Sequence, residues 1–217
     1  MSKHLFFDLD GTLTDSRLGI VRCLQHALVE LSIPSPPAEE LTRFVGPPLH
    51  DGFTALLGPE RVELVPRAIE LYRERFRTVG MFENAVYPGV ASSLELLRSS
   101  GRTLWVVTSK PQIFAEQIVE HFGLRRFFIK VYGSELSGVR ADKSELIAYV
   151  LAQESIVPGE ALMIGDRSHD AAGAAKNGVR AEGVLWGYGS REELTLAGAR
   201  AVHASMVELV RALLSAQ

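Results

Sequence analysis

Short apolar runs alternate with amphipathic segments along most of this chain. The apolar runs lie at 4–8, 103–108, 127–133, 161–165 and 181–187. Segments with apolar residues at helical spacing lie between most of them, at 90–100, 113–123 and 143–154. Strands that are apolar on both faces and alternate with helices are typical of a parallel sheet covered on both sides. The pattern therefore predicts an α/β fold with a doubly wound parallel sheet.

Residues 16–84 break this alternation, because they contain no convincing strand. An amphipathic helix from about residue 16 ends at the Pro-rich stretch 34–37, and a Gly-Pro-Pro turn follows at 46–48. The spacing then predicts one long helix from Glu60 to about Val79. We expect 16–84 to form an all-helical insert, and 1–15 and 85–217 to form the core.

Composition narrows the classes of protein that this sequence fits. The 217 residues are 47% apolar and 23% charged, which suits a globular protein with a sizeable core. A net charge of -3 argues against a nucleic-acid polymer as partner, and no apolar stretch approaches the ~20 residues of a membrane helix. The apolar run near the N-terminus is too short for a signal peptide, so we expect a cytoplasmic protein. We expect it to be a monomer or a homodimer.

Polar side chains gather where the predicted strands end. Asp8 and Asp10 end the first run, Thr108-Ser109-Lys110 ends the second, and Asp166 to Asp170 follow the run at 161–165. Lys143 begins the helix before that run. Because ligands bind at the carboxyl ends of parallel strands, we expect these groups to converge on one edge of the sheet. Carboxylates so close together repel unless a cation lies among them, and Mg²⁺ prefers such oxygen ligands.

A metal ion, a lysine and a hydroxyl group around carboxylates suit a phosphoryl group. Lys143 and Thr108 would bind phosphate oxygens, and one aspartate would attack phosphorus to give an aspartyl-phosphate. The second aspartate, two residues away, would protonate the leaving oxygen and later take a proton from the attacking water. Gly11 permits a sharp turn after the aspartates, and the Thr12 hydroxyl would hold that loop.

Four motifs in this order resemble those of the haloacid dehalogenase-like phosphatases, over essentially the whole chain. They are Asp8-Leu9-Asp10-Gly11-Thr12, Thr108, Lys143, and Gly165-Asp166 with Asp170. The resemblance implies that Asp8 is the nucleophile and Asp10 the general acid and base. It also implies that Thr108, Ser109 and Lys143 bind phosphate. Mg²⁺ would then be held by Asp8, the Asp10 backbone carbonyl and Asp166, with support from Asp170. It implies a Rossmann-like core and makes the insert a helical cap domain of the first type.

The subgroup is suggested by shorter signatures. Tyr87-Pro88-Gly89, Thr108 to Pro111 and Gly187-Tyr188-Gly189 resemble the phosphoglycolate phosphatase-like enzymes. A small phosphorylated metabolite, with 2-phosphoglycolate as leading candidate, is therefore the expected substrate. Alternatives are a 5'-nucleotidase or another sugar-phosphate phosphatase, a β-phosphoglucomutase-like phosphoryl transferase, and a non-catalytic binding protein on the same fold.

Two other reactions of this superfamily fit the sequence poorly. Asp10 argues against dehalogenation, because the leaving group of that reaction needs no proton. The absence of lysine from 16–84 argues against phosphonate cleavage, which needs a cap lysine. Arg43 and the turn at Gly46 are the residues that we expect to read the substrate. Whether Lys110 contacts phosphate or faces solvent stays open.

Overall fold

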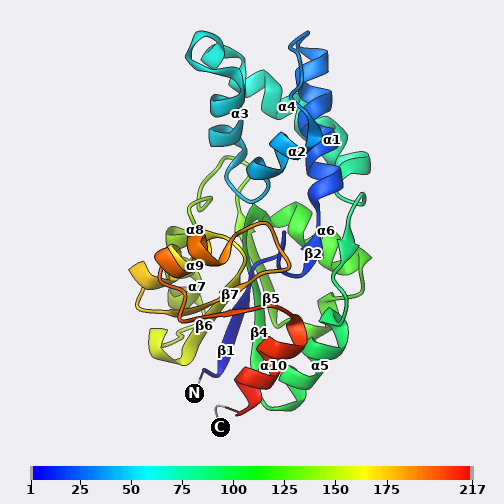
Figure 1. The fold of residues 1–217 in the computed structure, drawn as a ribbon. Coiled ribbons are helices and arrows are strands. Elements are labelled where there is room, and N and C mark those ends of the chain that lie inside the picture. Colours follow the sequence, from blue (N-terminus) through cyan, green and yellow to red (C-terminus); the bar gives the residue numbers. More distant parts are fainter. Residues whose placement is uncertain (1, 216–217) are drawn as a thin grey trace. The chain divides into compact units, whose positions relative to one another are not determined.

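A computed structural model describes residues 2–215 of the chain, which divides into two compact units (Figure 1). The core unit comprises Met1–Thr14 and Val86–Gln217, and the helical unit comprises Asp15–Ala85. Asp15 and Ala85 stand one residue outside the range 16–84 that the sequence predicts for an insert. No helix among the described residues is long and apolar enough to cross a membrane.

The core unit is built on a parallel sheet, to which residues 2–215 contribute six strands. They are β1 (His4–Phe7), β4 (Thr103–Pro111), β5 (Lys130–Ser134), β6 (Ala161–Gly165), β7 (Arg180–Val184) and β8 (Ala201–His203). Their order is β5-β4-β1-β6-β7-β8, and every neighbouring pair is parallel. Because β4 and β6 flank β1, the chain reverses direction across the sheet there, and the carboxyl end of β1 is the switch point where such sheets bind ligands.

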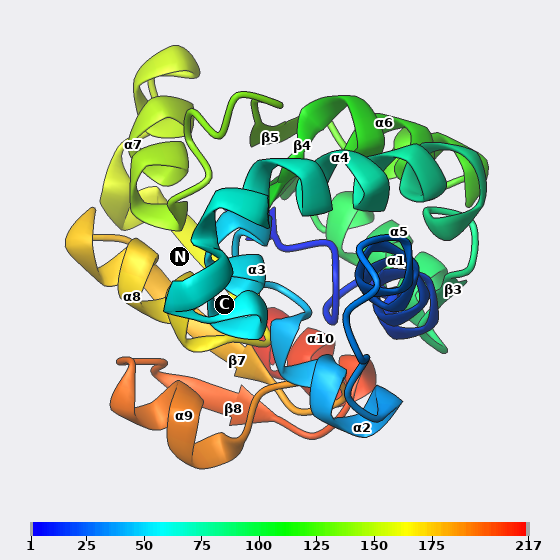
Figure 2. The same ribbon diagram turned by 90° about the horizontal axis from the view of Figure 1, so that it is seen from above.

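Helices cover both faces of this sheet, as the view along the strands shows (Figure 2). On one side lie α7 (Lys143–Gln153), α8 (Ser168–Lys176) and α9 (Arg191–Leu196). On the other lie α5 (Val90–Ser99), α6 (Gln112–His121) and α10 (Met206–Ser215). Leu5, Phe6 and Phe7 are fully buried although successive side chains of a strand point to opposite faces. The predicted α/β fold with a parallel sheet is thus confirmed.

Some element boundaries differ from the prediction. Residues Arg125–Phe127 form a 3₁₀ turn, so the strand expected at 127–133 begins only at Lys130. The run at 181–187 yields a strand that ends at Val184, and the loop after it carries Trp186. The apolar pattern predicts none of α9, β8 and α10, which the structure contains.

The helical unit contains α1 (Arg17–Glu30), α2 (Ala38–Leu41), α3 (Leu49–Leu57) and α4 (Val65–Arg75). The single helix predicted from Glu60 to Val79 is wrong. Pro59–Leu64 is a 3₁₀ segment, α4 begins at Val65, and Phe76–Gly80 forms a π turn. Pro66 explains the break, because proline has no N–H to donate and is tolerated only in the first turn of a helix.

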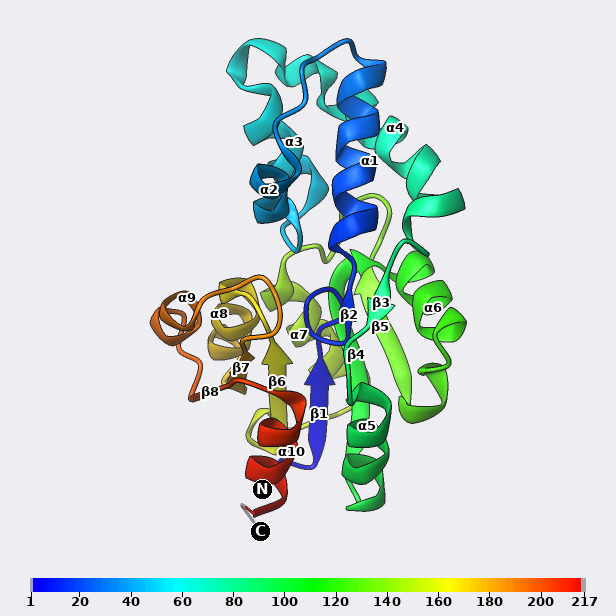
Figure 3. The same cartoon turned by 45° about the vertical axis from the view of Figure 1, so that its right-hand side comes forward.

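The chain enters and leaves the helical unit through two short strands that pair with each other, β2 (Thr14–Asp15) and β3 (Ala85–Val86) (Figure 3). Within the unit, α1 packs closely on the turn after α4. A Cβ on Gly19 would lie 2.0 Å from the Gly80 carbonyl oxygen, so only glycine allows this approach.

Ion pairs hold the same region of the helical unit together. Glu83 accepts from Arg75 Nη1 at 2.6 Å and from Arg22 Nη1 at 2.6 Å. The hydrogen bond from Arg75, followed by that from Arg22, keeps the pKa of Glu83 below its usual value although burial opposes this. Cys23, fully buried beside Arg75, is the small packing residue that its helical position indicates.

Candidate active site

A tight loop after β1 carries both aspartates of the first motif. The Asp8 amide donates to the Ile164 carbonyl at 2.9 Å, which continues the pairing of β1 with β6. Gly11 then takes a φ of 83°, in the left-handed region that favours glycine. A Cβ at this position would lie 2.2 Å from Asp166 Oδ2. The glycine therefore lets the loop close onto Asp166.

Lys143 lies at the centre of the site. It is the first residue of α7, whose N-cap Asp142 accepts from the second and third helical amides. The ammonium Nζ is 2.8 Å from Asp8 Oδ1, 2.8 Å from Asp170 Oδ1 and 2.9 Å from the Val107 carbonyl oxygen. Burial alone disfavours the charged amine, but Asp170 and Asp8 raise the pKa of Lys143 above its usual value. The lysine is charged, and it fixes the orientation of Asp8.

Three carboxylates meet around this lysine. Asp8, Asp166 and Asp170 each offer an oxygen within 4.8 Å of the others, and they are 3%, 0% and 1% exposed. Asp166 accepts from the Tyr188 amide at 2.8 Å and from the Thr12 hydroxyl at 3.4 Å. Within the described chain, no cationic side chain lies within 4.0 Å of Asp166.

The charges of this cluster do not balance without a further cation. Burial, with Asp170 and Asp8, raises the pKa of Asp166 well above its usual value. One lysine against three buried carboxylates leaves excess negative charge, which a divalent cation would neutralise. The donor set consists of carboxylate oxygens, which hard cations such as Mg²⁺ prefer. The residues present therefore fit a metal site.

Asp170 is packed tightly behind the cluster. Its Oδ2 accepts from the Arg167 amide at 3.2 Å and so caps the start of α8. A Cβ on Gly165 would lie 2.3 Å from the Asp170 carboxyl carbon. Burial raises the pKa of Asp170, but Lys143, His169 and the hydrogen bond from the Arg167 amide together hold it below its usual value. Asp170 caps the helix with Oδ2 and contacts Lys143 with Oδ1, so it makes both contacts at once.

The Asp10 side chain pairs with a different lysine from Asp8 and Asp170. Its Oδ2 is 2.7 Å from Lys110 Nζ, and both side chains are less than a tenth exposed, at 9% and 6%. Asp10 Oδ1 is buried and has no hydrogen-bond partner. The sequence did not decide whether Lys110 contacts phosphate or faces solvent. In the structure, Lys110 forms an ion pair with Asp10.

The second motif lies at the same edge of the sheet. Thr108 is 2% exposed, directly after the Val107 carbonyl that accepts from Lys143, and its hydroxyl accepts from the Lys110 amide at 3.3 Å. The Ser109 carbonyl accepts from the Ser134 hydroxyl at 2.8 Å, which ties the end of β4 to β5. Both residues thus lie on a strand end that contributes to the cluster.

The loop after β7 holds the first motif in place, and sequence reasoning assigned it no role. Trp186 Nε1 donates to the Thr12 carbonyl oxygen at 2.9 Å. A Cβ on Gly187 would lie 2.3 Å from the Gly11 carbonyl oxygen, so this loop and the Asp8–Asp10 loop are in direct contact. The only signal was Gly187-Tyr188-Gly189, whose small residues permit that close approach.

Glu193 was also missed. Its Oε1 accepts from the Ser168 amide at 2.8 Å and from Arg167 Nε at 2.9 Å, which anchors the segment between Asp166 and Asp170. Nothing in the spacing of the motifs points to this residue, because it lies 25 positions from Ser168.

Two further candidates from the sequence, Arg43 and Gly46, belong to the helical unit. Arg43 is exposed, and its guanidinium lies 4.9 Å from the centre of the Phe44 ring. Gly46 has a φ of 106°, which makes the Gly-Pro-Pro turn dependent on glycine. Their part in reading the substrate stays a prediction.

Comparisons with known proteins agree with this arrangement. Residues 5–184 match the family of haloacid dehalogenase-like hydrolases. The chain is 47% identical over 191 residues to a 5'-nucleotidase of Pseudomonas aeruginosa, covering 88% of this chain and 86% of that protein. It is 38% identical over 208 residues to the tyrosine-protein kinase PtkA of Mycobacterium tuberculosis, covering 95% and 70%.

More distant relatives include the enzyme that the signatures favoured. A phosphoglycolate phosphatase of Vibrio parahaemolyticus is 26% identical over 219 residues, covering 96% of this chain and 94% of that protein. The crystal structure of a predicted phosphatase from Clostridium acetobutylicum matches with a TM-score of 0.95 and 40% identity, covering 99% of both chains. By family match, sequence identity and the clustered motif residues, this chain belongs to the haloacid dehalogenase-like hydrolases.

Proposed function

We propose that the protein is a Mg²⁺-dependent phosphomonoester hydrolase that acts on a small metabolite through an aspartyl-phosphate, with nucleoside 5'-monophosphates as its first substrate class. The observation that carries the proposal is the ion pair of 2.8 Å between Lys143 Nζ and Asp8 Oδ1, set among three buried carboxylates. This pair orients a carboxylate at the carboxyl end of β1, as an attacking nucleophile requires. Burial raises the pKa of Asp8, and the charge of Lys143 opposes that rise and so favours the carboxylate form that attacks.

In the first step, an Asp8 carboxylate oxygen attacks phosphorus and the bond from phosphorus to the leaving oxygen breaks. Asp10 gives its proton to that leaving oxygen. Asp10 Oδ1, buried and without a hydrogen-bond partner, is the oxygen free for this transfer, since Oδ2 is paired with Lys110. Thr108, Ser109 and Lys143 would hold the remaining phosphate oxygens.

In the second step, Asp10 takes a proton from water, and the water oxygen attacks phosphorus. The bond between phosphorus and Asp8 breaks, which releases inorganic phosphate and restores both side chains. Asp8, the Asp10 carbonyl and Asp166 would hold Mg²⁺, with Asp170 in support. When bound, the ion neutralises negative charge on the phosphate oxygens and among the carboxylates.

The substrate class rests on the relatives. Identity to the 5'-nucleotidase is 47%, against 26% for the phosphoglycolate phosphatase. This difference favours a nucleotide over 2-phosphoglycolate, the leading candidate from the sequence signatures. The signature Thr108-Ser109-Lys110-Pro111 resembles 5'-nucleotidases as well as phosphoglycolate phosphatase-like enzymes, so it does not decide between the two substrates.

The proposal is tested by phosphate release from a panel of nucleoside 5'-monophosphates, 2-phosphoglycolate and glucose 1-phosphate, with Mg²⁺ and with a chelator. We expect release that depends on Mg²⁺, with the highest kcat/KM for a nucleotide. A preference for 2-phosphoglycolate would overturn the substrate class alone. Phosphoryl transfer to a second hydroxyl without phosphate release, or no reaction with any ester, would overturn hydrolysis itself.

A further inference from the structure

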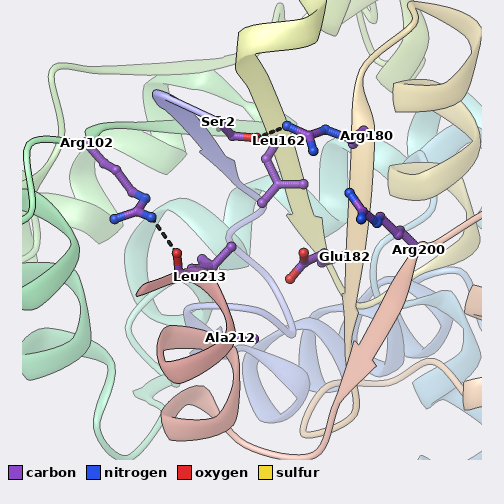
Figure 4. A pocket seen from close by; sticks show the side chains of 8 residues that line it. All are labelled: Ser2, Arg102, Leu162, Arg180, Glu182, Arg200, Ala212 and Leu213. Carbon is purple, nitrogen blue, oxygen red and sulfur yellow. Dashed lines mark hydrogen bonds between the residues drawn. The ribbon is translucent and has the colours of Figure 1, made fainter. Parts of the chain in front are cut away.

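A cavity with a volume of about 340 Å³ lies in the core unit (Figure 4). Its lining is Ser2, Arg102, Leu162, Arg180, Glu182, Arg200, Ala212 and Leu213. Figure 4 shows Arg180 and Arg200 on one side of Leu162, and Arg102 on the other side, next to Leu213. Its volume falls within the range of small-molecule sites, about 300–1,000 Å³.

This cavity is at the opposite end of the sheet from the catalytic cluster. Arg180 is the first residue of β7, and Arg102 and Arg200 each stand one position before a strand, at β4 and β8. Leu162 lies four positions before Asp166, and four residues of extended strand span about 13 Å. A ligand in the cavity would therefore contact none of the residues proposed for hydrolysis.

The cavity has an excess of positive charge. In the part of the chain that the structure describes, no carboxylate lies within 4.0 Å of any of the three guanidinium groups. Arg180 donates to the Ser2 hydroxyl at 2.8 Å, and Arg102 donates to the Leu213 carbonyl oxygen at the end of α10. The Arg200 side chain makes no hydrogen bond to a described residue.

The single acid of the lining does not neutralise these charges. Glu182 Oε2 is 2.8 Å from His203 Nε2, so its carboxylate is engaged by a buried histidine rather than by an arginine. The lining thus carries three positive charges against one negative charge. Apart from Ser2, the rest of the lining is apolar and consists of Leu162, Ala212 and Leu213.

We propose that this cavity binds a small organic phosphate at a site separate from catalysis. Arg180 and Arg200 bind the doubly charged phosphate, because a guanidinium presents paired donors that match phosphate oxygens. Arg102 adds long-range attraction while it caps α10. The apolar side of the lining contacts the organic part of the ligand. Glu182 disfavours a ligand whose whole surface is anionic.

The first test uses ADP as the probe, with the intact protein and a chelator, so that the result does not depend on hydrolysis. Arginines are modified with phenylglyoxal and each site is quantified by peptide mass spectrometry. We expect ADP to slow modification of Arg180 and Arg200 by about threefold or more, as for guanidiniums engaged by phosphate. Exposed Arg126 of the same unit is the control and should react unchanged. Equal reactivity of Arg180 and Arg200 with and without ADP would overturn the proposal.

The second test is ADP affinity by calorimetry. The double variant Arg180→Glu, Arg200→Glu should weaken binding at this site by about tenfold or more, the worth of a lost charged contact. Arg126→Glu supplies a charge-reversal control, and each variant is first checked for an unchanged circular dichroism spectrum. Equal losses in the Arg126 variant would show attraction by net charge alone and contradict a site. A parallel titration with inorganic phosphate should give weaker binding; equal affinity would contradict the contribution of the apolar lining.

Discussion

The buried cluster of the core unit and the exposed ion pairs on the helices of the helical unit use charged residues in opposite ways. In the core unit, Asp8, Asp166, Asp170 and Lys143 are at most 3% exposed, and Lys143 contacts both Asp8 and Asp170 at 2.8 Å. In the helical unit, pairs such as Arg67–Glu70 lie on the surface, with side chains 53% and 64% exposed. Exposed pairs contribute about 0–1 kcal/mol, whereas breaking a buried pair costs about 3–5 kcal/mol.

This contrast indicates what each set of charges is for. Several carboxylates buried beside one lysine destabilise a fold unless a ligand uses them, so their presence points to chemistry. Solvated pairs on helices carry no such cost and no such implication. We therefore expect substitutions in the core cluster to abolish activity, and substitutions in the helical unit to change substrate preference or stability modestly.

The largest effect is expected at Asp8. Asp8→Asn should keep the fold, because Lys143 still has Asp170 as partner, but an amide does not attack phosphorus. We expect kcat for phosphate release to fall by about 10⁴-fold or more. Asp51→Asn, an exposed acid of the helical unit, is the matched control and should retain full activity. Residual activity of Asp8→Asn within tenfold of the parent would refute the assignment.

A smaller loss is expected at Asp10. Asp10→Asn removes proton transfer but leaves the nucleophile, so kcat should fall by about 10²–10⁴-fold. The loss should be smaller for nitrophenyl phosphate, whose leaving group needs less protonation, than for an alkyl phosphate. Steady-state kinetics on both esters checks this. Equal losses on the two esters would count against Asp10 as the acid.

In the helical unit, we expect an effect that depends on the substrate. Arg43 has no carboxylate partner among the described residues, so it is available for an anionic or polar group of the leaving portion. Arg43→Ala should lower kcat/KM for the best substrate by about tenfold, the worth of one charged hydrogen bond, and leave nitrophenyl phosphate unchanged. Gly46→Ala, strained at its φ of 106°, should act in the same direction. Arg61→Ala serves as control. An equal loss of kcat/KM on both substrates in the Arg43 variant would contradict a role of Arg43 in substrate selection.

The smallest effect concerns stability. Because Arg75 and Arg22 hold the pKa of Glu83 below its unfolded value, their contribution is fully present above that value, about pH 4, and is lost as pH falls through the folded pKa. Glu83→Gln should lower the free energy of unfolding by about 1 kcal/mol at pH 7 and by less at pH 3. Denaturant titrations at both pH values check this against Glu63→Gln. The same loss at pH 3 as at pH 7 would contradict the ion-pair account.

The sequence predicted the sheet well where burial on both faces leaves an unbroken apolar run, as at Leu5 to Phe7. It missed β8, a strand of only three residues that ends at His203, and it missed α9 and α10, which carry no motif. It also placed one helix across Pro66, although the missing N–H of that residue was readable. The proline, and not the apolar periodicity, sets the start of α4.

In the candidate site, residues defined by a motif came together, and residues that support them were not found. Asp8, Lys143, Asp166 and Asp170 were named from their order and their place at strand ends. Trp186 contacts the Thr12 carbonyl, and Glu193 contacts Arg167 and the Ser168 amide. These partners are far away in sequence, and no local pattern encodes such contacts. The direction of Lys110 was undecidable, since a long flexible side chain at a strand end reaches either solvent or Asp10.

The central claim is that Asp8 becomes phosphorylated during turnover, and it is tested most directly by trapping. The protein is mixed with Mg²⁺ and its best nucleotide substrate, quenched in acid within one turnover, and reduced with borohydride, which converts an acyl phosphate to the alcohol. The peptide from His4 to Arg17 is then sequenced by mass spectrometry. We expect homoserine at position 8, only with substrate present and not in Asp8→Asn. Phosphate release with Asp8 unmodified in every sample would contradict the account.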